Sequence, residues 1–185
     1  VTGLTLSPAQ LEWAQKRVPE ADLRLQDYRD TREQFDHVVS IEMFEAVGER
    51  WWPTYFKTIA RALKPGGRAV VQSITIRDDL FADYRKGTDF IQQYVFPGGM
   101  LPSRSAFRAA AARQGLAVRG EYAFGTDYAR TLADWRLAFE ASWPQIAALG
   151  FDEPFRRLWR MYLCYCEAAF LAGNIDVVHF ELGHH

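Results

Sequence analysis

Short apolar runs alternate with amphipathic stretches over the first part of the chain. The apolar runs predict strands at residues 1–6, 23–26, 36–41 and 68–76. The stretches between them predict a helix at residues 8–18, with Ser7 as N-cap and Pro8 at the first helical position, and a second helix at about 50–63. Strands and helices that alternate at this spacing indicate an α/β fold.

The second part of the chain has a less regular pattern. Residues 77–102 show no clear period, and Ser103 then caps a predicted helix before a strand at residues 116–124. Two long helices follow from apolar stripes, one at Leu132, Trp135, Phe139, Trp143 and Ile146 and one at Phe155, Leu158, Tyr162, Cys166 and Phe170. A last strand is predicted at residues 175–182. We interpret residues 1–182 as one domain and residues 183–185 as the remnant of a purification tag.

The strand at residues 36–41 is continuously apolar at Val38, Val39 and Ile41, as in a parallel sheet, and we expect it to be buried. An acidic loop follows this strand. It carries two carboxylates, Glu42 and Glu45, and a Pro-Gly-Gly turn at residues 65–67 precedes the next strand. Strand, acidic loop, helix, glycine turn and strand together resemble the second half of a doubly wound, Rossmann-like fold. In such folds the loops at the carboxyl ends of the strands carry ligand and chemistry. We therefore expect a reacting centre at this loop.

The glycine-rich turn that opens a doubly wound cofactor fold is not found in this sequence, which starts at what reads as the second strand. Either the unit binds no nucleotide-type cofactor, or the chain is the C-terminal part of a longer protein; we favour the second. The first strand would lie beside residues 1–6 and 38–41. We expect either a gap filled by a partner chain or direct pairing of these strands, and unpaired edges favour a homo-oligomer.

Composition argues against several classes of function. The net charge of −1 gives no electrostatic reason to bind nucleic acid. The four histidines lack metal-ligand spacing, so we expect no metal. Cys164 and Cys166 point to different faces of a predicted helix, which argues against a disulfide and for a reducing compartment. No apolar run approaches the ~20 residues that cross a bilayer. We predict a cytoplasmic protein, with peripheral contact at the inner face of a membrane.

Five segments stand in the order found in a known family, at residues 3–10, 40–48, 63–67, 94–103 and 127–135. Through them the chain resembles the cyclopropane-fatty-acyl-phospholipid synthases and the related mycolic acid cyclopropane synthases. The resemblance implies a class I methyltransferase fold and the use of S-adenosylmethionine. It also implies transfer of a methylene group to the cis double bond of an unsaturated fatty acyl chain of a phospholipid, which forms a cyclopropane ring.

The resemblance assigns cofactor contacts to seven residues: Thr5, Leu6, Ser7, Gln10, Tyr28, Arg29 and Ile41. Thr5 stands where common relatives of this fold place an acid that binds ribose hydroxyls, and Ser7 and Gln10 are neutral hydrogen-bonding groups beside it. Taken alone, the residues favour a simpler interpretation in which Ser7 is only an N-cap and Gln10 an exposed helical residue. The family match reverses that preference.

A catalytic set follows from the same resemblance. In the family a glutamate, a histidine, an isoleucine and a tyrosine hold a bicarbonate ion, and the matching positions here are Glu45, Gln72, Ile74 and Tyr128. Gln72 departs from the family's histidine, because it donates and accepts hydrogen bonds but does not titrate near neutral pH. Whether the anion or Glu45 accepts the proton stays open. Without the resemblance, Glu45 is equally well explained as a first-turn residue that favours the helix dipole.

Aromatic residues predict the substrate pocket. Alkylation of an alkene leaves a cation in the acyl chain, and aromatic faces stabilise a cation by ~0.5–2 kcal/mol. Phe44, Tyr128 and Phe96 are the candidates, in that order. The apolar segment 94–103 is interpreted as part of the acyl pocket or its rim, whereas the stripes on the late helices are interpreted as core.

Two alternative functions stay open. In the first, the protein is a methyltransferase that makes branched or methylene products, or that acts on another lipid or a small amine. Alternatively, the chain as given is an inactive domain that binds S-adenosylmethionine poorly, because it lacks the glycine-rich turn.

Overall fold

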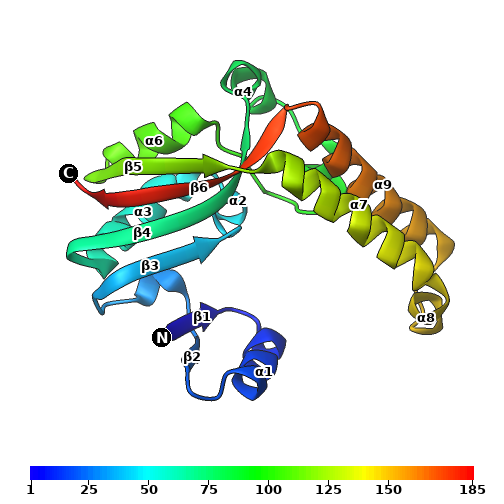
Figure 1. Cartoon of the computed structure of the whole chain (residues 1–185), viewed down its shortest axis with the longest axis horizontal. Helices are drawn as coiled ribbons and strands as arrows, with labels where there is room; N and C mark the ends of the chain where they lie inside the picture. Colours follow the sequence, from blue (N-terminus) through cyan, green and yellow to red (C-terminus); the bar gives the residue numbers. More distant parts are fainter.

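The computed structural model describes all residues from 1 to 185, which form six strands, nine α-helices and two 3₁₀-helices (Figure 1). The strands are β1 (Thr2–Thr5), β2 (Asp22–Leu25), β3 (Phe35–Ile41), β4 (Leu63–Ile76), β5 (Leu116–Ala123) and β6 (Ile175–His184). The α-helices are α1 (Pro8–Arg17), α2 (Phe44–Val47), α3 (Trp52–Ala62), α4 (Asp78–Tyr84), α5 (Phe90–Tyr94), α6 (Arg104–Ala112), α7 (Gly125–Ala141), α8 (Trp143–Ala148) and α9 (Glu153–Leu171). The 3₁₀-helices are η1 (Tyr28–Asp30) and η2 (Glu49–Trp51). The predicted α/β class is confirmed.

Four strands form the main sheet, in the order β3-β4-β6-β5. β3 and β4 are parallel, whereas β6 runs antiparallel to both of its neighbours. The register aligns Gln72 with Ile41 on one side and with His179 on the other. Residues that share a register position and a face of the sheet lie next to one another. Gln72 therefore has one neighbour at the end of β3 and one in the middle of β6.

β1 and β2 form a parallel pair of their own, apart from the main sheet. Of the two expected outcomes, direct pairing of residues 1–6 with 38–41 is wrong, because no ladder joins β1 to β3. The unit is attached through η1, where the Tyr28 ring packs edge-on against Tyr55 of α3 at 5.9 Å between centroids. The Arg61 guanidinium also donates hydrogen bonds to the carbonyl oxygens of Arg29 and Thr31, at 3.1 and 2.7 Å.

One face of the main sheet carries the aromatic core. α2, α3 and α6 cover this face, and the Phe107 ring of α6 stacks on Phe180 of β6 at 3.9 Å between centroids. The fully buried aromatic side chains here are Phe44, Tyr55, Phe56, Phe107 and Phe180. Burial of one such ring stabilises the fold by roughly 1.5–3 kcal/mol. This packing holds α2, and the acidic loop with it, against the sheet.

The opposite face of the sheet is open over much of its area. Val39 and Ile41 of β3 are 67% and 55% exposed, and Tyr122 of β5 is 65% exposed. The prediction of a fully buried strand at residues 36–41 is therefore wrong. Side chains alternate along a strand, so Val38 and Ser40 point toward α3 while Val39 and Ile41 point to a face that no helix covers at this end.

α7 and α9 pack together as an arm that leaves the sheet, with α8 at its tip (Figure 1). A second core joins the arm to β6 through Leu132, Leu163, Phe170 and Val177. The sequence pattern predicted one helix through Trp143 and Ile146, but α7 ends at Ala141 and α8 starts anew at Trp143. Pro144 explains the break, because proline is accommodated in the first turn of a helix but disrupts the interior.

Two predicted strand boundaries move, and one segment predicted to be irregular contains helices. β4 begins at Leu63, so the Pro-Gly-Gly turn lies inside the strand rather than before it. β6 continues beyond its predicted end through His184. The segment 77–102, predicted to be irregular, contains α4 and α5, and α5 begins with a capping box formed by Asp89 and Gln92. None of the helices is both long enough and apolar enough to cross a membrane.

Candidate active site

Glu45 is held against β4 from the first turn of α2. Its Oε1 atom accepts hydrogen bonds from the Ser73 hydroxyl, at 3.0 Å, and from the backbone N–H of Ile74. Two of the four predicted catalytic residues, Glu45 and Ile74, are thus in direct contact. Both donors belong to consecutive residues of β4, so the strand fixes the position of the carboxyl group.

The second oxygen of Glu45, Oε2, is buried and has no hydrogen-bond partner. Burial raises the pKa of Glu45, the hydrogen bonds from Ile74 and Ser73 oppose the rise, and the nearby charge of Glu42 adds to it. A buried oxygen without a partner is uncommon in native proteins and marks a position where a ligand can complete the hydrogen bonding.

Tyr128 stands in the first turns of α7, with its ring packed against Phe170 and Trp135. The Tyr128 hydroxyl donates a hydrogen bond to Glu42 Oε2 at 3.1 Å. Burial raises the pKa of Tyr128, the negative charge of Glu42 raises it further, and Glu45 contributes in the same direction. The phenol therefore keeps its proton at neutral pH and acts as a hydrogen-bond donor.

Gln72 does not contact Glu45. Its amide Nε2 donates to Glu42 Oε1 at 2.8 Å, and its Oε1 lies 2.7 Å from His179 Nε2. Gln72 and Tyr128 therefore meet at Glu42 rather than at Glu45. Glu42 was noted in the sequence only as part of the acidic loop, and His179 was not selected at all. The cross-strand alignment that brings His179 to Gln72 has no local signal in the sequence.

The predicted cofactor residues lie at the carboxyl ends of β1, β2 and β3. Thr5 is the last residue of β1, and its hydroxyl donates to Gln10 Oε1 at 2.7 Å and accepts from the Ser7 backbone N–H at 3.1 Å. Ser7 is the N-cap of α1, as the simpler interpretation expected, because its hydroxyl accepts from the Gln10 N–H. Its own hydroxyl proton has no partner in these contacts and is left to donate to a ligand.

The remaining predicted cofactor residues lie in three different places. Leu6 is exposed beside Ser7, and Tyr28 and Arg29 form η1. The Arg29 guanidinium is paired with Asp27 at 2.7 Å. Ile41 ends β3 on its exposed face. The seven residues are thus divided among the β1–β2 unit, η1 and the main sheet.

Phe44 is not a substrate-facing ring. It is fully buried in the aromatic core, 4.9 Å from Tyr55 and 5.2 Å from Phe107 between ring centroids. The short helix α2 explains this correction, because Glu45 turns toward β4 and its neighbour Phe44 then faces α3 and α6. Phe96 is 55% exposed and packs edge-on against Tyr162 of the arm.

The apolar segment 94–103 packs against the acidic loop that carries Glu45. The Met100 N–H donates to the Glu45 carbonyl oxygen at 2.9 Å, and the Gln92 amide donates to the Gly99 carbonyl oxygen at 2.8 Å. The first contact joins the segment directly to the acidic loop, and the second ties it to α5. The segment 94–103 thus lies beside the candidate active site. Its role as part of an acyl pocket stays a prediction.

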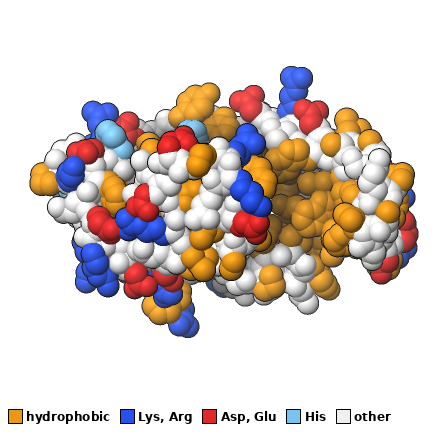
Figure 2. Space-filling view, turned by 90° about the horizontal axis from the view of Figure 1, so that it is seen from below, with side chains coloured by type: hydrophobic (Ala, Val, Ile, Leu, Met, Phe, Trp, Pro, Cys, Tyr) orange, Lys and Arg blue, Asp and Glu red, His pale blue; other side chains and the backbone are white.

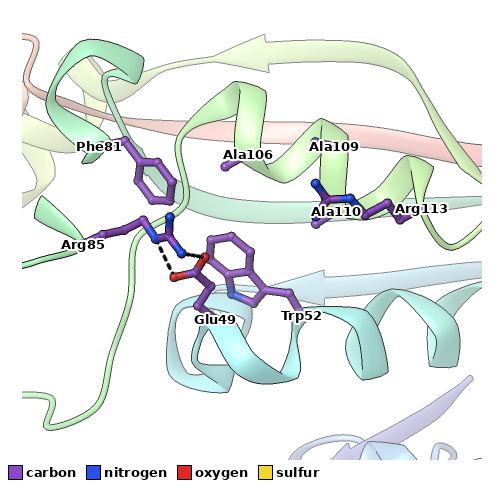
Figure 3. A pocket seen from close by; sticks show the side chains of 8 residues that line it. All are labelled: Glu49, Trp52, Phe81, Arg85, Ala106, Ala109, Ala110 and Arg113. Atoms are coloured by element: carbon purple, nitrogen blue, oxygen red, sulfur yellow. Dashed lines mark hydrogen bonds and ion pairs between the residues drawn. The ribbon is translucent and has the colours of Figure 1, made fainter. Parts of the chain in front are cut away.

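A cavity of about 280 Å³ lies on the covered side of the sheet and contains none of the predicted site residues (Figure 3). Its lining includes Trp52, Phe81 and the small side chains of α6, and an ion pair of 2.7 Å between Glu49 and Arg85 lies across it. The predicted chemistry is thus located at the loops and not in this cavity.

Comparison with known proteins agrees with this geometry. Residues 1–180 match the family described as mycolic acid cyclopropane synthetase. The chain belongs to this family. It is 40% identical to the tuberculostearic acid methyltransferase UfaA1 of Mycobacterium tuberculosis, over 98% of this chain and 44% of the relative. It is 38% identical to the cyclopropane-fatty-acyl-phospholipid synthase of Escherichia coli K12, over 96% of this chain and 45% of the relative.

The chain thus spans about half the length of these two curated relatives. Among solved structures, mycolic acid cyclopropane synthase CmaA1 in complex with SAH and CTAB superposes with a TM-score of 0.88 and 30% identity. That comparison covers 98% of this chain and 69% of the other. The predicted class I methyltransferase fold is confirmed, for the part of the fold that this chain contains.

Proposed function

We propose that the protein is an S-adenosylmethionine-dependent enzyme that adds a methylene group to the cis double bond of an unsaturated phospholipid acyl chain, forming a cyclopropane ring. The observation that carries the proposal is the carboxyl group of Glu45. One of its oxygens is fixed by β4, and the other is buried without a partner within electrostatic reach of the Tyr128 phenol. Family membership supports the reaction class.

The cofactor fits the groups at the ends of the strands. Thr5, Ser7 and Gln10 offer neutral hydroxyl and amide groups suited to the hydroxyls of a ribose, and the exposed side chain of Ile41 offers an apolar surface for a flat ring. The aromatic ring of Tyr28 packs against Tyr55 of α3, in the connection between the β1–β2 unit and the main sheet. When bound, S-adenosylmethionine supplies an electrophilic methyl group on a sulfonium.

A small anion beside Glu45 supplies the base in this proposal. Because burial raises the pKa of Glu45, the protonated carboxyl is favoured, and its Oε2–H then donates to an anion where an ionised carboxylate would repel one. Bicarbonate is an anion of suitable size and basicity. Glu45 and Tyr128 would hold it, Tyr128 through its oxygen because its one proton is donated to Glu42, and the bound anion would supply a base for the methyl carbon added to the acyl chain.

The substrate occupies the apolar side of the site. Figure 2 shows a hollow lined by hydrophobic side chains between the half of the molecule that holds the sheet and the helical arm. The rings of Tyr128 and Phe96 pack against residues of the arm, Trp135 and Tyr162, and in this proposal their faces stabilise positive charge in the acyl chain. We further propose that the protein is cytoplasmic, reaches its lipid by peripheral contact with the inner face of the membrane, and associates as a homo-oligomer.

The test of the proposal uses the full-length protein with methyl-labelled S-adenosylmethionine and vesicles of unsaturated phospholipid. Lipid mass spectrometry is expected to find the label in a product one methylene heavier and without the double bond. Replacement of Glu45 by alanine removes the donor to the anion and with it this product, whereas Glu49→Ala retains the product, because Glu49 pairs with Arg85 away from the site. Label recovered only in a hydroxyl or amine product would refute the proposal.

A second candidate product is favoured by Gln72. Its amide is bonded to Glu42 and His179, so it does not bring a titrating group to the anion. If ring closure is slow, the cation can instead lose a proton from a neighbouring carbon of the chain, which leaves a methyl-branched alkene. It can also move by a hydride shift to the methyl-bearing carbon and then lose a methyl proton, which leaves a methylene branch. The fragmentation of the labelled lipid separates these products from a cyclopropane.

A further inference from the structure

A line of hydrogen bonds crosses the sheet from β6 to α7. His179 Nε2 lies 2.7 Å from Gln72 Oε1, Gln72 Nε2 lies 2.8 Å from Glu42 Oε1, and the Tyr128 hydroxyl lies 3.1 Å from Glu42 Oε2. The line joins a half-buried histidine to the phenol that stands at the candidate active site. His179 itself contacts neither Glu45 nor the predicted cofactor residues.

The direction of each hydrogen bond in the line follows from its chemistry. A carboxylate only accepts hydrogen bonds, so Gln72 must present its NH₂ group to Glu42 and its carbonyl oxygen to His179. The imidazole must then donate, and the proton lies on Nε2 of His179. Every hydrogen in the line points toward Glu42, so the two ends of the line are coupled through one carboxylate.

Glu42, the carboxylate on which the line of hydrogen bonds converges, has an unusual backbone conformation. It is the one non-glycine residue of the chain with a positive φ, at 50°. Left-handed conformations are unfavourable for residues with a Cβ, so the surrounding contacts must hold the residue there. The contacts are those of Gln72 and Tyr128 with its carboxylate, together with its own N–H, which donates to the Gln72 carbonyl oxygen at 2.9 Å.

The packing around His179 leaves little freedom for its ring. Phe124 lies against the imidazole at 4.8 Å between ring centroids, and Tyr122 lies at 6.3 Å. Because β4 and β6 align His179 with Gln72, the donor of the imidazole stays opposite the carbonyl oxygen of the amide. The position at which the family resemblance expects a histidine holds Gln72, and this chain has an imidazole one strand away, bonded to it.

We propose that His179 is a positioning residue that fixes the Tyr128 hydroxyl through Gln72 and Glu42. The inference rests on the proposed function, in which Tyr128 orients the reacting groups. Without the Nε2–H donor, the Gln72 amide is free to rotate, Glu42 loses its fixed donor and the Tyr128 hydroxyl loses its fixed acceptor. The proposal predicts a slower chemical step with little change in cofactor binding, because Thr5, Ser7 and Gln10 lie on a separate unit.

The first experiment compares His179→Leu with His179→Gln in the full-length protein. Glutamine keeps an N–H donor and leucine does not, so leucine is expected to lower kcat about tenfold, the rate equivalent of one hydrogen bond, while glutamine stays within about threefold of wild type. KM for S-adenosylmethionine is expected to be little changed in both. His37→Leu, at an exposed position of β3, is the control and is expected to behave as wild type.

A second readout needs no turnover. With 3-fluorotyrosine in place of Tyr128, the ¹⁹F signal is expected to move in His179→Leu and to keep its wild-type position in His179→Gln and His37→Leu. Nitrogen NMR of the wild-type ring is expected to show a protonated Nε2. An unmoved ¹⁹F signal in the leucine variant, or a neutral ring protonated only on Nδ1, would overturn the inference. Loss of lipid alkylation in the wild type, with both NMR results as expected, would instead count against the proposed function alone.

Discussion

The main sheet and the β1–β2 unit differ in how they are held together. The sheet is packed on one side by an aromatic core of fully buried rings, and the acidic loop is hydrogen-bonded to β4. The β1–β2 unit has no buried residue in either strand or in α1, and it joins the rest of the molecule through η1. Glu45, the central group of the proposed chemistry, thus stands on the densely packed part, whereas most groups proposed to hold the cofactor stand on the unit that has no buried residue in its strands or in α1.

This difference predicts that chemistry and cofactor binding respond to separate changes. Precise placement matters most for groups that move protons, and a sheet places side chains better than a small satellite unit does. Changes in the core should unfold the molecule as a whole. Changes at η1 should release the β1–β2 unit alone.

The largest effect is expected from Glu45→Ala. Loss of the group that holds the proposed base lowers kcat by about 10²–10⁴-fold, while binding of S-adenosylmethionine is little changed because most of the cofactor groups lie on another unit. Single-turnover kinetics together with titration calorimetry check both halves of the expectation. A large loss of affinity with unchanged kcat would show that the two regions are not separate in function.

Phe107→Ala should destabilise the whole main sheet. Phe107 is fully buried and stacks on Phe180, and truncation of such a ring costs about 3–5 kcal/mol of unfolding free energy. Urea denaturation followed by circular dichroism gives the value. Leu25→Ala, at a position of β2 that is 53% exposed, is the control and is expected to cost much less. Equal losses in the two variants would contradict the contrast between the regions.

Arg61→Ala should loosen only the β1–β2 unit. The guanidinium donates to two carbonyl oxygens next to η1, and loss of such hydrogen bonds lowers the free energy of local opening by about 1–2 kcal/mol. Hydrogen exchange is expected to quicken at amides of β1 and β2 and to stay unchanged in β4 and β6. Arg17→Ala on α1, whose guanidinium lies over Trp13 within the same helix, provides the comparison and is expected to leave the exchange rates as they are.

The smallest effect concerns pH. Burial raises the pKa of Glu45 above its ordinary value of 4.5. A carboxyl group with a raised pKa in the folded state stabilises the protein while it is protonated, and this contribution is lost as pH rises through the folded pKa. Wild type should therefore lose stability relative to Glu45→Gln as pH is raised from about 4 to about 8. Urea midpoints of both proteins across this range provide the measurement, and parallel curves would contradict the expectation.

The sequence pattern located most elements and missed how they are oriented. The N-cap at Ser7, the predicted strands and the acidic loop after β3 are confirmed because capping and periodicity are local properties. The expectation for Phe44 was wrong because the facing of a four-residue helix is set by what packs around it. The prediction that β3 is buried on both faces was wrong for a similar reason, since an apolar strand looks the same in sequence whether one face or both are covered.

The residues of the candidate site also fall into two groups, those that the sequence indicated and those that only the structure revealed. The type of chemistry was indicated by Glu45 and Tyr128, whose residue types and motif positions can be read along the chain. Glu42 and His179 enter only through the folded structure: one through a left-handed backbone position held by its neighbours, the other through alignment with Gln72 across two strands. They are separated from their partners by tens of residues along the chain, and only sheet register brings them together.

The amino-acid sequence by itself determined the α/β alternation, the ends of most helices and the family-type motifs, because these depend on neighbouring residues and on backbone preferences. Tertiary structure alone decided which rings became core, which oxygen of Glu45 stayed without a partner, and that an imidazole reaches Tyr128 through Gln72 and Glu42. The reason is physical. Burial, pKa and hydrogen-bond partners depend on atoms that are close in space, and distant segments of the chain supply those atoms.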